Sequence, residues 1–180
     1  MSAGRSSALP EGFRLAEAKD APALASLVNA AYLGGEGWTT ETALLEGPRI
    51  DAEGIAALLA RPDSVVLVLE ADGALAGSVH LERREGYAYL GLLAVDPARQ
   101  TGGAGKRMLA VAEAWMASAW GTAQVRMTVL TARTELLAFY GRRGYRRTGR
   151  REPFPEGAGA GRPLREDLAL ETLEKDLGAP

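Results

Sequence analysis

The stretch that decides the fold runs from Val95 to Lys106 and reads VDPARQTGGAGK. It follows the apolar segment Leu90–Val95 and precedes a segment with helical periodicity, so its glycines lie at a strand-to-helix turn. Glycine permits positive φ and lets the backbone approach a ligand closely. The free amide groups and the dipole of the following helix favour a bound phosphate. The pattern therefore predicts an anion-binding turn.

Spacing separates three kinds of phosphate-binding loop. A Walker A loop ending at Gly105-Lys106 would place Gln100 where its first glycine belongs and Arg107 where it needs Ser or Thr. A dinucleotide fingerprint starting at Gly103 would require a glycine at Met108. Both patterns fail, which disfavours a nucleotide-hydrolysing protein. A third pattern, Gln/Arg-x-x-Gly-x-Gly/Ala, is matched at every position by residues 100–105.

Residues 100–105 resemble the acetyl-CoA pyrophosphate loop of the GNAT superfamily of N-acetyltransferases, and the preceding strand followed by Asp-Pro is typical of that family. Residues 133–145, RTELLAFYGRRGY, resemble the second family signature, a helix ending in Phe-Tyr, then a basic stretch and Gly-Phe/Tyr. The resemblance covers about residues 12–175. It implies an α+β acyl-CoA N-acyltransferase fold, with a central, mixed, mostly antiparallel sheet of six to seven strands flanked by about four to five helices.

Composition narrows the class of protein independently. The chain has 180 residues and a formal net charge of −2, so we expect a flexible tail over residues 1–11 and one domain over 12–180. The absence of cysteine excludes disulfides and thiol catalysis, and a single histidine argues against a zinc site. Without a basic excess, a long apolar run or a secretory signal, we expect no nucleic-acid partner, no membrane span and a cytoplasmic protein.

Periodicity predicts the element order β-α-α-β-β-β-α-β-α-β-β, which is α+β with one mixed sheet. We expect strands over Phe13–Glu17, Val65–Glu70, Leu75–Arg83, Tyr87–Val95, Val125–Leu130, Tyr145–Arg151 and Asp167–Leu173. We expect Asp20 to cap a first helix, Thr39 or Thr40 to cap a short second one that carries Leu44 and Leu45, and Asp51 to cap a third, which Pro62 stops. Further helices are expected after the glycine turn to Ala119 and over Thr134–Arg142. An exposed edge strand near the C-terminus would permit a homodimer.

The resemblance implies acetyl-CoA as co-substrate and no metal. In the family, pantetheine lies in the gap where the strand before the turn and the next strand splay apart. The residues implied to bind acetyl-CoA are Leu93, Ala94, Val95, Gln100, Thr101, Gly102, Gly103, Ala104, Gly105, Lys106, Arg133 and Tyr140. Arg133 departs from the frequent asparagine of the family, and Gly102 replaces a frequent basic residue. Backbone amides must therefore carry more of the binding.

Three side chains are candidates for the two proton-transfer roles, general acid and general base. Tyr140 matches the family tyrosine near the thioester sulfur and would act as general acid, since a phenol pKa near 10 suits a leaving thiolate. Packing in the core is the alternative role for Tyr140. The family's glutamate position falls at Tyr89, so His80 or Glu82, which strand alternation places on one face, are candidate bases. A structural His80, a solvated Glu82, a water relay or an acceptor that arrives neutral remain alternatives.

The resemblance implies that the Gly-flanked segment that holds Glu36, Trp38, Thr39, Glu41 and Arg49 forms the wall of the acceptor site, and Tyr89 is a further expected substrate-binding residue. Polar groups of both signs suit a small zwitterionic or amine acceptor, although ordinary caps and surface charges would look the same. The sequence thus predicts transfer of an acetyl group to a primary amine of a small molecule or peptide, by direct attack in a ternary complex. A non-catalytic domain that binds CoA is the alternative.

Overall fold

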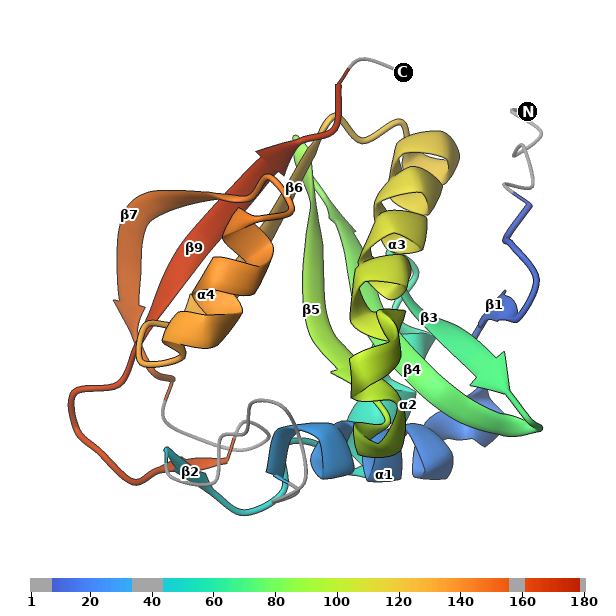
Figure 1. Ribbon diagram of the computed structural model, residues 1–180, viewed down its shortest axis with the longest axis horizontal. Coiled ribbons are helices and arrows are strands. Elements are labelled where there is room, and N and C mark those ends of the chain that lie inside the picture. Colours follow the sequence, from blue (N-terminus) through green and yellow to red (C-terminus); the bar gives the residue numbers. More distant parts are fainter. Residues whose placement is uncertain (1–7, 34–43, 156–160, 179–180) are drawn as a thin grey trace.

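The computed structural model describes residues 8–33, 44–155 and 161–178 (Figure 1). Short 3-10 helices at Ala18–Asp20 and Pro97–Gly102 precede α1 and α3. The strands are β1 (Phe13–Leu15), β2 (Leu45–Glu46), β3 (Ser64–Ala71), β4 (Ala74–Arg84), β5 (Tyr87–Val95), β6 (Gln124–Leu130), β7 (Arg146–Pro153), β8 (Arg162–Pro163) and β9 (Ala169–Asp176). The α-helices are α1 (Ala21–Leu33), α2 (Ala52–Ala60), α3 (Ala104–Trp120) and α4 (Thr134–Gly141).

Seven strands form one sheet in the order β1-β3-β4-β5-β6-β9-β7. Every neighbouring pair is antiparallel except β5 and β6, which are parallel. The β3–β4 hairpin turns at Asp72 and Gly73, whose φ angles of 53° and 73° are those that a tight two-residue hairpin needs. The predicted meander and the predicted mixed, mostly antiparallel sheet are confirmed.

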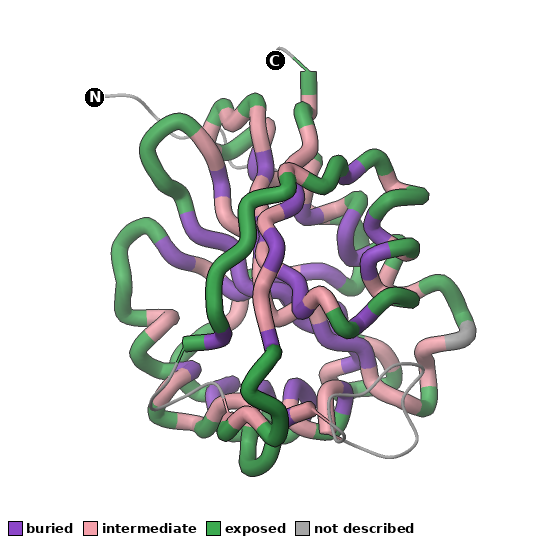
Figure 2. The backbone as a smooth tube through the Cα atoms, turned by 90° about the vertical axis from the view of Figure 1, so that its left-hand side faces the viewer, coloured by how far each residue is buried: buried purple, intermediate pink, exposed green. Residues whose placement is uncertain are grey.

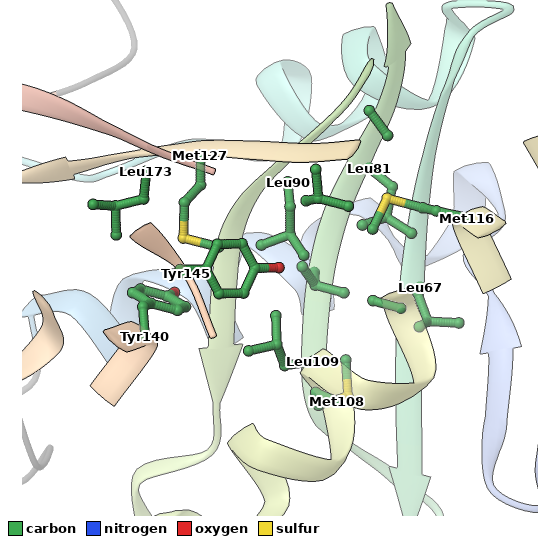
Figure 3. Close-up of a cluster of buried hydrophobic side chains, with 14 of the residues drawn as sticks. Leu67, Leu81, Leu90, Met108, Leu109, Met116, Met127, Tyr140, Tyr145 and Leu173 are labelled. Carbon is green, nitrogen blue, oxygen red and sulfur yellow. The ribbon is translucent and has the colours of Figure 1, made fainter. Parts of the chain in front are cut away.

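Helices cover both faces of this sheet because its central strands are apolar on both sides. Along β3, Leu67 belongs to the cluster that contains Met108 and Met116 of α3, whereas its neighbour Val66 packs with Leu24 of α1. Successive strand residues point to opposite faces, so α1 and α2 lie on one face and α3 on the other. Figure 3 shows the side chains of α3 directed at those of the strands.

The parallel pair β5–β6 stays together over only two residue pairs, Ala88 with Val125 and Tyr89 with Arg126. Beyond them the two strands diverge, as Figure 1 shows. The register of β5 against β4 also shifts there, and Leu92 takes a φ of 49°, rare for a residue with a side chain. Such a bulge bends and twists its strand. The backbone of β5 beyond Tyr89 is thereby turned away from β6.

One predicted helix is wrong. Leu45, expected in a short helix with Leu44, lies in strand β2, which pairs antiparallel with β8. The reason is tertiary, because Leu45 is buried against Leu130, Phe154 and Leu168, and its neighbour Glu46 forms an ion pair with Arg162. Thr39 and Thr40, the predicted caps, lie outside the described residues.

Two predicted caps have different outcomes. Asp51 caps α2, since its carboxylate accepts a hydrogen bond from the amide of Gly54 at 2.7 Å. Asp20 was expected to cap α1, but its carboxylate instead accepts from the amide of Glu17 and pairs with Arg14 at 2.7 Å. Arg14 thereby lowers the pKa of Asp20 below its usual value.

Strand β7 forms one edge of the sheet, and its residues are mostly exposed (Figure 2). It carries four arginines, and such charges discourage pairing with a second strand. Two of them, Arg147 and Arg151, pair with the buried Glu171 of β9. The homodimer stays a prediction. No described helix is both long and apolar enough to span a membrane.

Candidate active site

A cavity of about 510 Å³, which we call the glycine-turn cavity, lies between the start of α3 and the side of α4. It gathers most of the residues that the sequence predicted as cofactor-binding, namely Leu93, Val95, Gln100, Gly103, Gly105, Lys106, Arg133 and Tyr140. The remaining ones do not line it. Ala94 is buried against α1, Gly102 and Ala104 lie outside the lining, and the side chain of Thr101 lies outside the described part of the structure.

The glycine turn presents main-chain amides to this cavity. Gly103 has a φ of 74° and begins α3, and the amide of Arg107 is the one that donates to its carbonyl, at 3.0 Å. The first amides of an α-helix have no partner within that helix, so the amides of Ala104, Gly105 and Lys106 are the candidate donors to a ligand. A Cβ at Gly103 would meet nothing within 4 Å, which shows that the turn stands open.

Some side chains around the glycine turn hold its backbone in place, and others add positive charge to the cavity. The Gln100 side chain donates to the carbonyl of Val95 at 3.2 Å and so ties the turn to the end of β5. Lys106 and Arg143 line the cavity and add positive charge, and the Arg143 guanidinium lies 3.8 Å over the ring of Phe139. Arg99 instead pairs with Asp72, at 2.8 Å. The combination of free amides with two cations suits a bound diphosphate.

A second cavity, of about 250 Å³, lies where β5 and β6 diverge, and we call it the strand-gap cavity. Its walls come from β5, β6, the segment before α2, and the start of α4. Five residues line both cavities: Tyr32, Leu93, Arg133, Leu136 and Tyr140. The two cavities therefore meet beside Tyr140.

Tyr140 packs in the core and also lines both cavities, and its role as general acid stays a prediction. It is buried, and its ring lies 5.3 Å from that of Phe139 and 5.7 Å from that of Tyr145. Figure 3 shows Tyr140 near Tyr145 in the core. Burial raises the pKa of Tyr140, and the nearby Arg133 charge works in the opposite direction. The phenol is thus protonated at neutral pH, but it is a weaker acid than the free phenol on which the expectation from the sequence rested, and the Arg133 charge offsets only part of this change.

The two candidate bases lie in different surroundings. His80 lines the strand-gap cavity, and its Nε2 lies 2.8 Å from Oγ of Ser64. Burial lowers the pKa of His80 to about 4, so the ring is neutral at pH 7. Glu82 is buried and paired with Arg61 at 2.9 Å and Arg84 at 3.1 Å, and it lines neither cavity. The geometry favours His80 over Glu82 as a group that meets an acceptor.

The predicted acceptor residues are only partly described. Arg49 and Tyr89 both line the strand-gap cavity, whereas Glu36, Trp38, Thr39 and Glu41 lie outside the described residues. Phe154 packs with Leu130, which lines the strand-gap cavity, but itself lines neither cavity.

The sequence analysis missed Tyr32, which lines both cavities from α1. Tyr32 lies four residues after Val28 and continues the apolar stripe of that helix, so its position carried a weak signal. Leu136 of α4 was missed as well, since nothing in its local sequence separates a lining leucine from a core leucine.

Comparison with known proteins agrees with this architecture. The profile of the acetyltransferase (GNAT) family matches residues 23–145. The chain belongs to this family, whose members are acetyl-CoA-dependent N-acetyltransferases. No curated protein matched the sequence.

Solved structures show the same fold at low identity. The ribosomal-protein-S18-alanine N-acetyltransferase from Escherichia coli is 17% identical with a TM-score of 0.68, covering 93% of this chain and 94% of that one. An N-acetyltransferase from Staphylococcus aureus Mu50 is 12% identical with a TM-score of 0.69, covering 92% and 96%. A candidate streptothricin acetyltransferase from Bacillus anthracis str. Ames, solved in complex with acetyl coenzyme A, is 19% identical with a TM-score of 0.54, covering 67% and 66%.

Proposed function

We propose that this chain transfers the acetyl group of acetyl-CoA to a primary amine of a small molecule or peptide, by direct attack within a ternary complex. The single observation that carries the proposal is that the glycine-turn cavity and the strand-gap cavity meet beside Tyr140. Two substrates bound in the two cavities would place their reacting groups at this junction. Such alignment supplies a large part of the rate of a two-substrate reaction.

The residues of the glycine-turn cavity fit acetyl-CoA. The amides that open α3, with Lys106 and Arg143, would hold the diphosphate. The diverging part of β5, where Leu93 lines both cavities, leaves main-chain groups for the pantetheine arm to pair with. These contacts would bring the thioester to the junction.

The proton balance assigns one role to Tyr140. The neutral amine attacks the thioester carbonyl, a C–N bond forms, and the C–S bond breaks as the tetrahedral intermediate collapses. The leaving thiolate takes the phenol proton of Tyr140, the new amide releases a proton to water, and the phenolate regains a proton from water, so the overall transfer releases no net proton. The Arg133 charge eases the formation of the phenolate, since it opposes the effect of burial on the pKa of Tyr140.

His80 is a poor base for this reaction. Its pKa of about 4 lies about six units below that of an alkyl ammonium, so it does not take a proton from a charged amine. We therefore propose that the enzyme binds the acceptor amine from solution in its neutral form. The strand-gap cavity, at about 250 Å³, has room for a small amine or the end of a peptide.

Tyr140→Phe tests the proposal and separates it from the alternative of a non-catalytic domain that binds CoA. We expect kcat to fall by about a hundredfold or more, the usual contribution of a general acid. The acetyl-CoA Kd, measured by calorimetry, should stay within about twofold because the phenol oxygen is not part of the glycine turn.

Tyr145→Phe is the matched control. Tyr145 is the adjacent buried tyrosine, and its hydroxyl donates to Glu113 at 2.8 Å, away from both cavities. Its loss should lower the free energy of unfolding by about 1 kcal/mol and leave kcat within about twofold. Equal kcat values for the two variants would remove Tyr140 from the mechanism. An acetyl-CoA complex that acetylates no amine in a broad panel would support the non-catalytic alternative.

A further inference from the structure

His80 is a buried polar side chain to which the proposed mechanism gives no role. It is 6% exposed, and it lines the strand-gap cavity from β4 without reaching the glycine-turn cavity. Burial lowers its pKa to about 4, so at pH 7 the ring is neutral and carries a single proton on one of its two nitrogens. The nitrogen that carries this proton decides whether His80 offers the cavity a hydrogen-bond donor or an acceptor.

One of the two ring nitrogens is already engaged. Nε2 lies 2.8 Å from Oγ of Ser64, which begins β3, is buried and lines neither cavity. The two nitrogens of an imidazole point in nearly opposite directions, so Nδ1 is turned toward the cavity. Nδ1 has no hydrogen-bond partner among the described residues, and these residues do not seal it off from solvent. It is therefore open to a ligand in the cavity.

The hydrogen bonds of Ser64 assign the ring proton to Nδ1. The Ser64 hydroxyl has no partner other than His80 among the described side chains and carbonyls. If Nε2 carried the proton and donated it to Ser64, the hydroxyl hydrogen would be buried with no acceptor, which is costly. If Ser64 donates to Nε2, both atoms are satisfied and the ring proton lies on Nδ1. His80 thus presents an N–H donor to the strand-gap cavity.

The place of His80 in the cavity decides what this donor meets. The acceptor amine would react beside Tyr140, where the two cavities meet, whereas His80 lines the strand-gap cavity alone. His80 pairs across the sheet with Gly91, in the part of β5 that has diverged from β6, and its ring lies 6.4 Å from that of Tyr89. The donor therefore meets a part of the acceptor other than its reacting amine.

We propose that the acceptor carries a carbonyl oxygen apart from its primary amine, as a peptide or an amino-acid amide does, and that His80, positioned by Ser64, selects it through Nδ1–H. This inference rests on the proposed function and names the class of its acceptor. A carbonyl oxygen matches the donor because it accepts hydrogen bonds and donates none. A hydrocarbon chain in its place would leave the donor unpaired and dry. A second ammonium, as in a diamine, would place donor against donor.

The position of the proton can be observed directly, because His80 is the single histidine of the chain. The nitrogen chemical shifts of its ring, measured by NMR at pH 7, show which nitrogen is protonated. We expect Nδ1–H in the native protein and in Ser64→Thr, which keeps the hydroxyl. We expect Nε2–H, the form that a free histidine side chain prefers in water, in Ser64→Ala. Nε2–H in the native protein would overturn the inference.

The second experiment compares matched acceptors. Acetyl transfer is measured for amino-acid amides, for alkylamines of the same length that lack the oxygen, and for linear diamines. Each kcat/KM is divided by the fraction of neutral amine at the assay pH, because these amines differ in pKa. We expect the best amide to exceed its alkylamine by at least about tenfold, and diamines to be the poorest group. Alkylamines or diamines that react as well as amides would overturn the inference and leave the proposed function standing.

Variants locate the selectivity in His80. His80→Phe keeps a ring and loses the donor, so the ratio of kcat/KM for amide to that for alkylamine should approach one. His80→Gln returns an amide N–H and should restore part of the ratio. Tyr87→Phe is the matched control, since it removes a hydroxyl of β5 that lies outside both cavities, and it should preserve the ratio. An unchanged ratio in His80→Phe would overturn the role of His80.

Ser64 is tested as a positioning residue. Ser64→Ala should lower the ratio of amide to alkylamine about fivefold, because the ring proton is no longer held on Nδ1. Ser64→Thr should restore the ratio. If Ser64 is merely structural, Ser64→Ala will affect both acceptors equally. Thermal unfolding of each variant shows whether it is folded, and the NMR measurement on the native protein depends on no variant.

A binding measurement keeps the inference testable without turnover. Calorimetry on the CoA-saturated protein compares N-acetyl amino-acid amides with N-acetyl alkylamines of the same length. Tighter binding of the amides by at least about tenfold is expected, and equal binding would overturn the inference. Should no amine of any class be acetylated, the proposed function fails, and this binding preference decides, with the position of the ring proton, whether the His80 site exists.

Discussion

The glycine-turn cavity and the strand-gap cavity share a border but are built differently. Five residues that line the first, including two glycines, come from the contiguous stretch 95–106, and α4 forms its second wall. The second is made by side chains of α1, α2, β4, β5, β6 and α4, which tertiary packing alone brings together. A site made of backbone depends on local conformation, whereas a site made of side chains depends on how distant elements pack. The two should respond differently to mutation and to pH.

The largest expected effect concerns the strand-gap cavity. His80 has a pKa of about 4 in the folded chain and 6.5 when unfolded, so the unfolded chain binds more protons between these values. The free energy of unfolding therefore falls as the pH drops from about 6.5 to about 4. We expect His80 to account for a loss of about 2 kcal/mol between pH 7 and pH 4.5, measured by urea unfolding.

His80→Gln is the comparison for that measurement. The variant has no group that titrates in this range at position 80, so its loss over the same interval should be smaller by about 2 kcal/mol. Asp20 and Glu171, whose arginine partners lower their pKa values, titrate equally in both proteins and cancel. Identical losses in the two proteins would contradict the assigned burial of His80.

The next largest expected effect is a loss of acetyl-CoA affinity when the glycine turn is altered. Gly103 has a φ of 74°, and an L-residue in that region is destabilised by about 1–2 kcal/mol. Gly103→Ala should therefore weaken acetyl-CoA binding by about tenfold, since the bound form needs this conformation. Calorimetric titration with acetyl-CoA measures the change.

Gly121→Ala supplies the matched control, because Gly121 has a φ of 63° at the other end of the same helix. It should lose similar stability and bind acetyl-CoA as the native chain does. If both variants bind equally well, the turn is not the diphosphate site.

The smallest expected effect is a change in the acceptor KM caused by a substitution in the strand-gap cavity. A Cβ at Gly91 would lie 2.8 Å from Cε1 of Tyr89, whose ring is also covered by the Arg84 guanidinium at 4.6 Å. Gly91→Ala must displace that ring and should raise the acceptor KM about fivefold, with little change in acetyl-CoA affinity. Steady-state kinetics with both substrates measures it, with Gly141→Ala, where a Cβ meets nothing within 4 Å, as control. An equal loss for both substrates would contradict the division between the cavities.

The predictable part of the fold was local. The hairpin at Asp72-Gly73 and the strand–turn–helix around Gly103 follow from turn chemistry and periodicity over a few residues. Strand β2 was not predictable, because Leu45 and its partner Pro163 meet across 118 positions of the chain. The left-handed Leu92 gave no signal either, since nothing in a leucine marks a bulge.

The candidate site likewise has one part that local sequence predicts and one part that depends on tertiary contacts. Most of the glycine-turn cavity was predicted, because its ligand-binding groups are amides whose placement depends on adjacent glycines. In the strand-gap cavity, Arg49, His80 and Tyr89 were named, but the reason for their grouping was not. The hydrogen bond between Ser64 and His80 joins residues 16 positions apart and has no local signature.

The sequence by itself determined the class of protein, the order of most elements and the position of the glycine turn, because periodicity, turn residues and glycine spacing act over short stretches of chain. Only the tertiary structure decided that β5 and β6 diverge beyond Tyr89, that Tyr140 stands where two cavities meet, and that Ser64 holds His80 in the wall of the strand-gap cavity. These arrangements depend on side chains packing across elements that are remote in the chain, and no local pattern encodes such contacts.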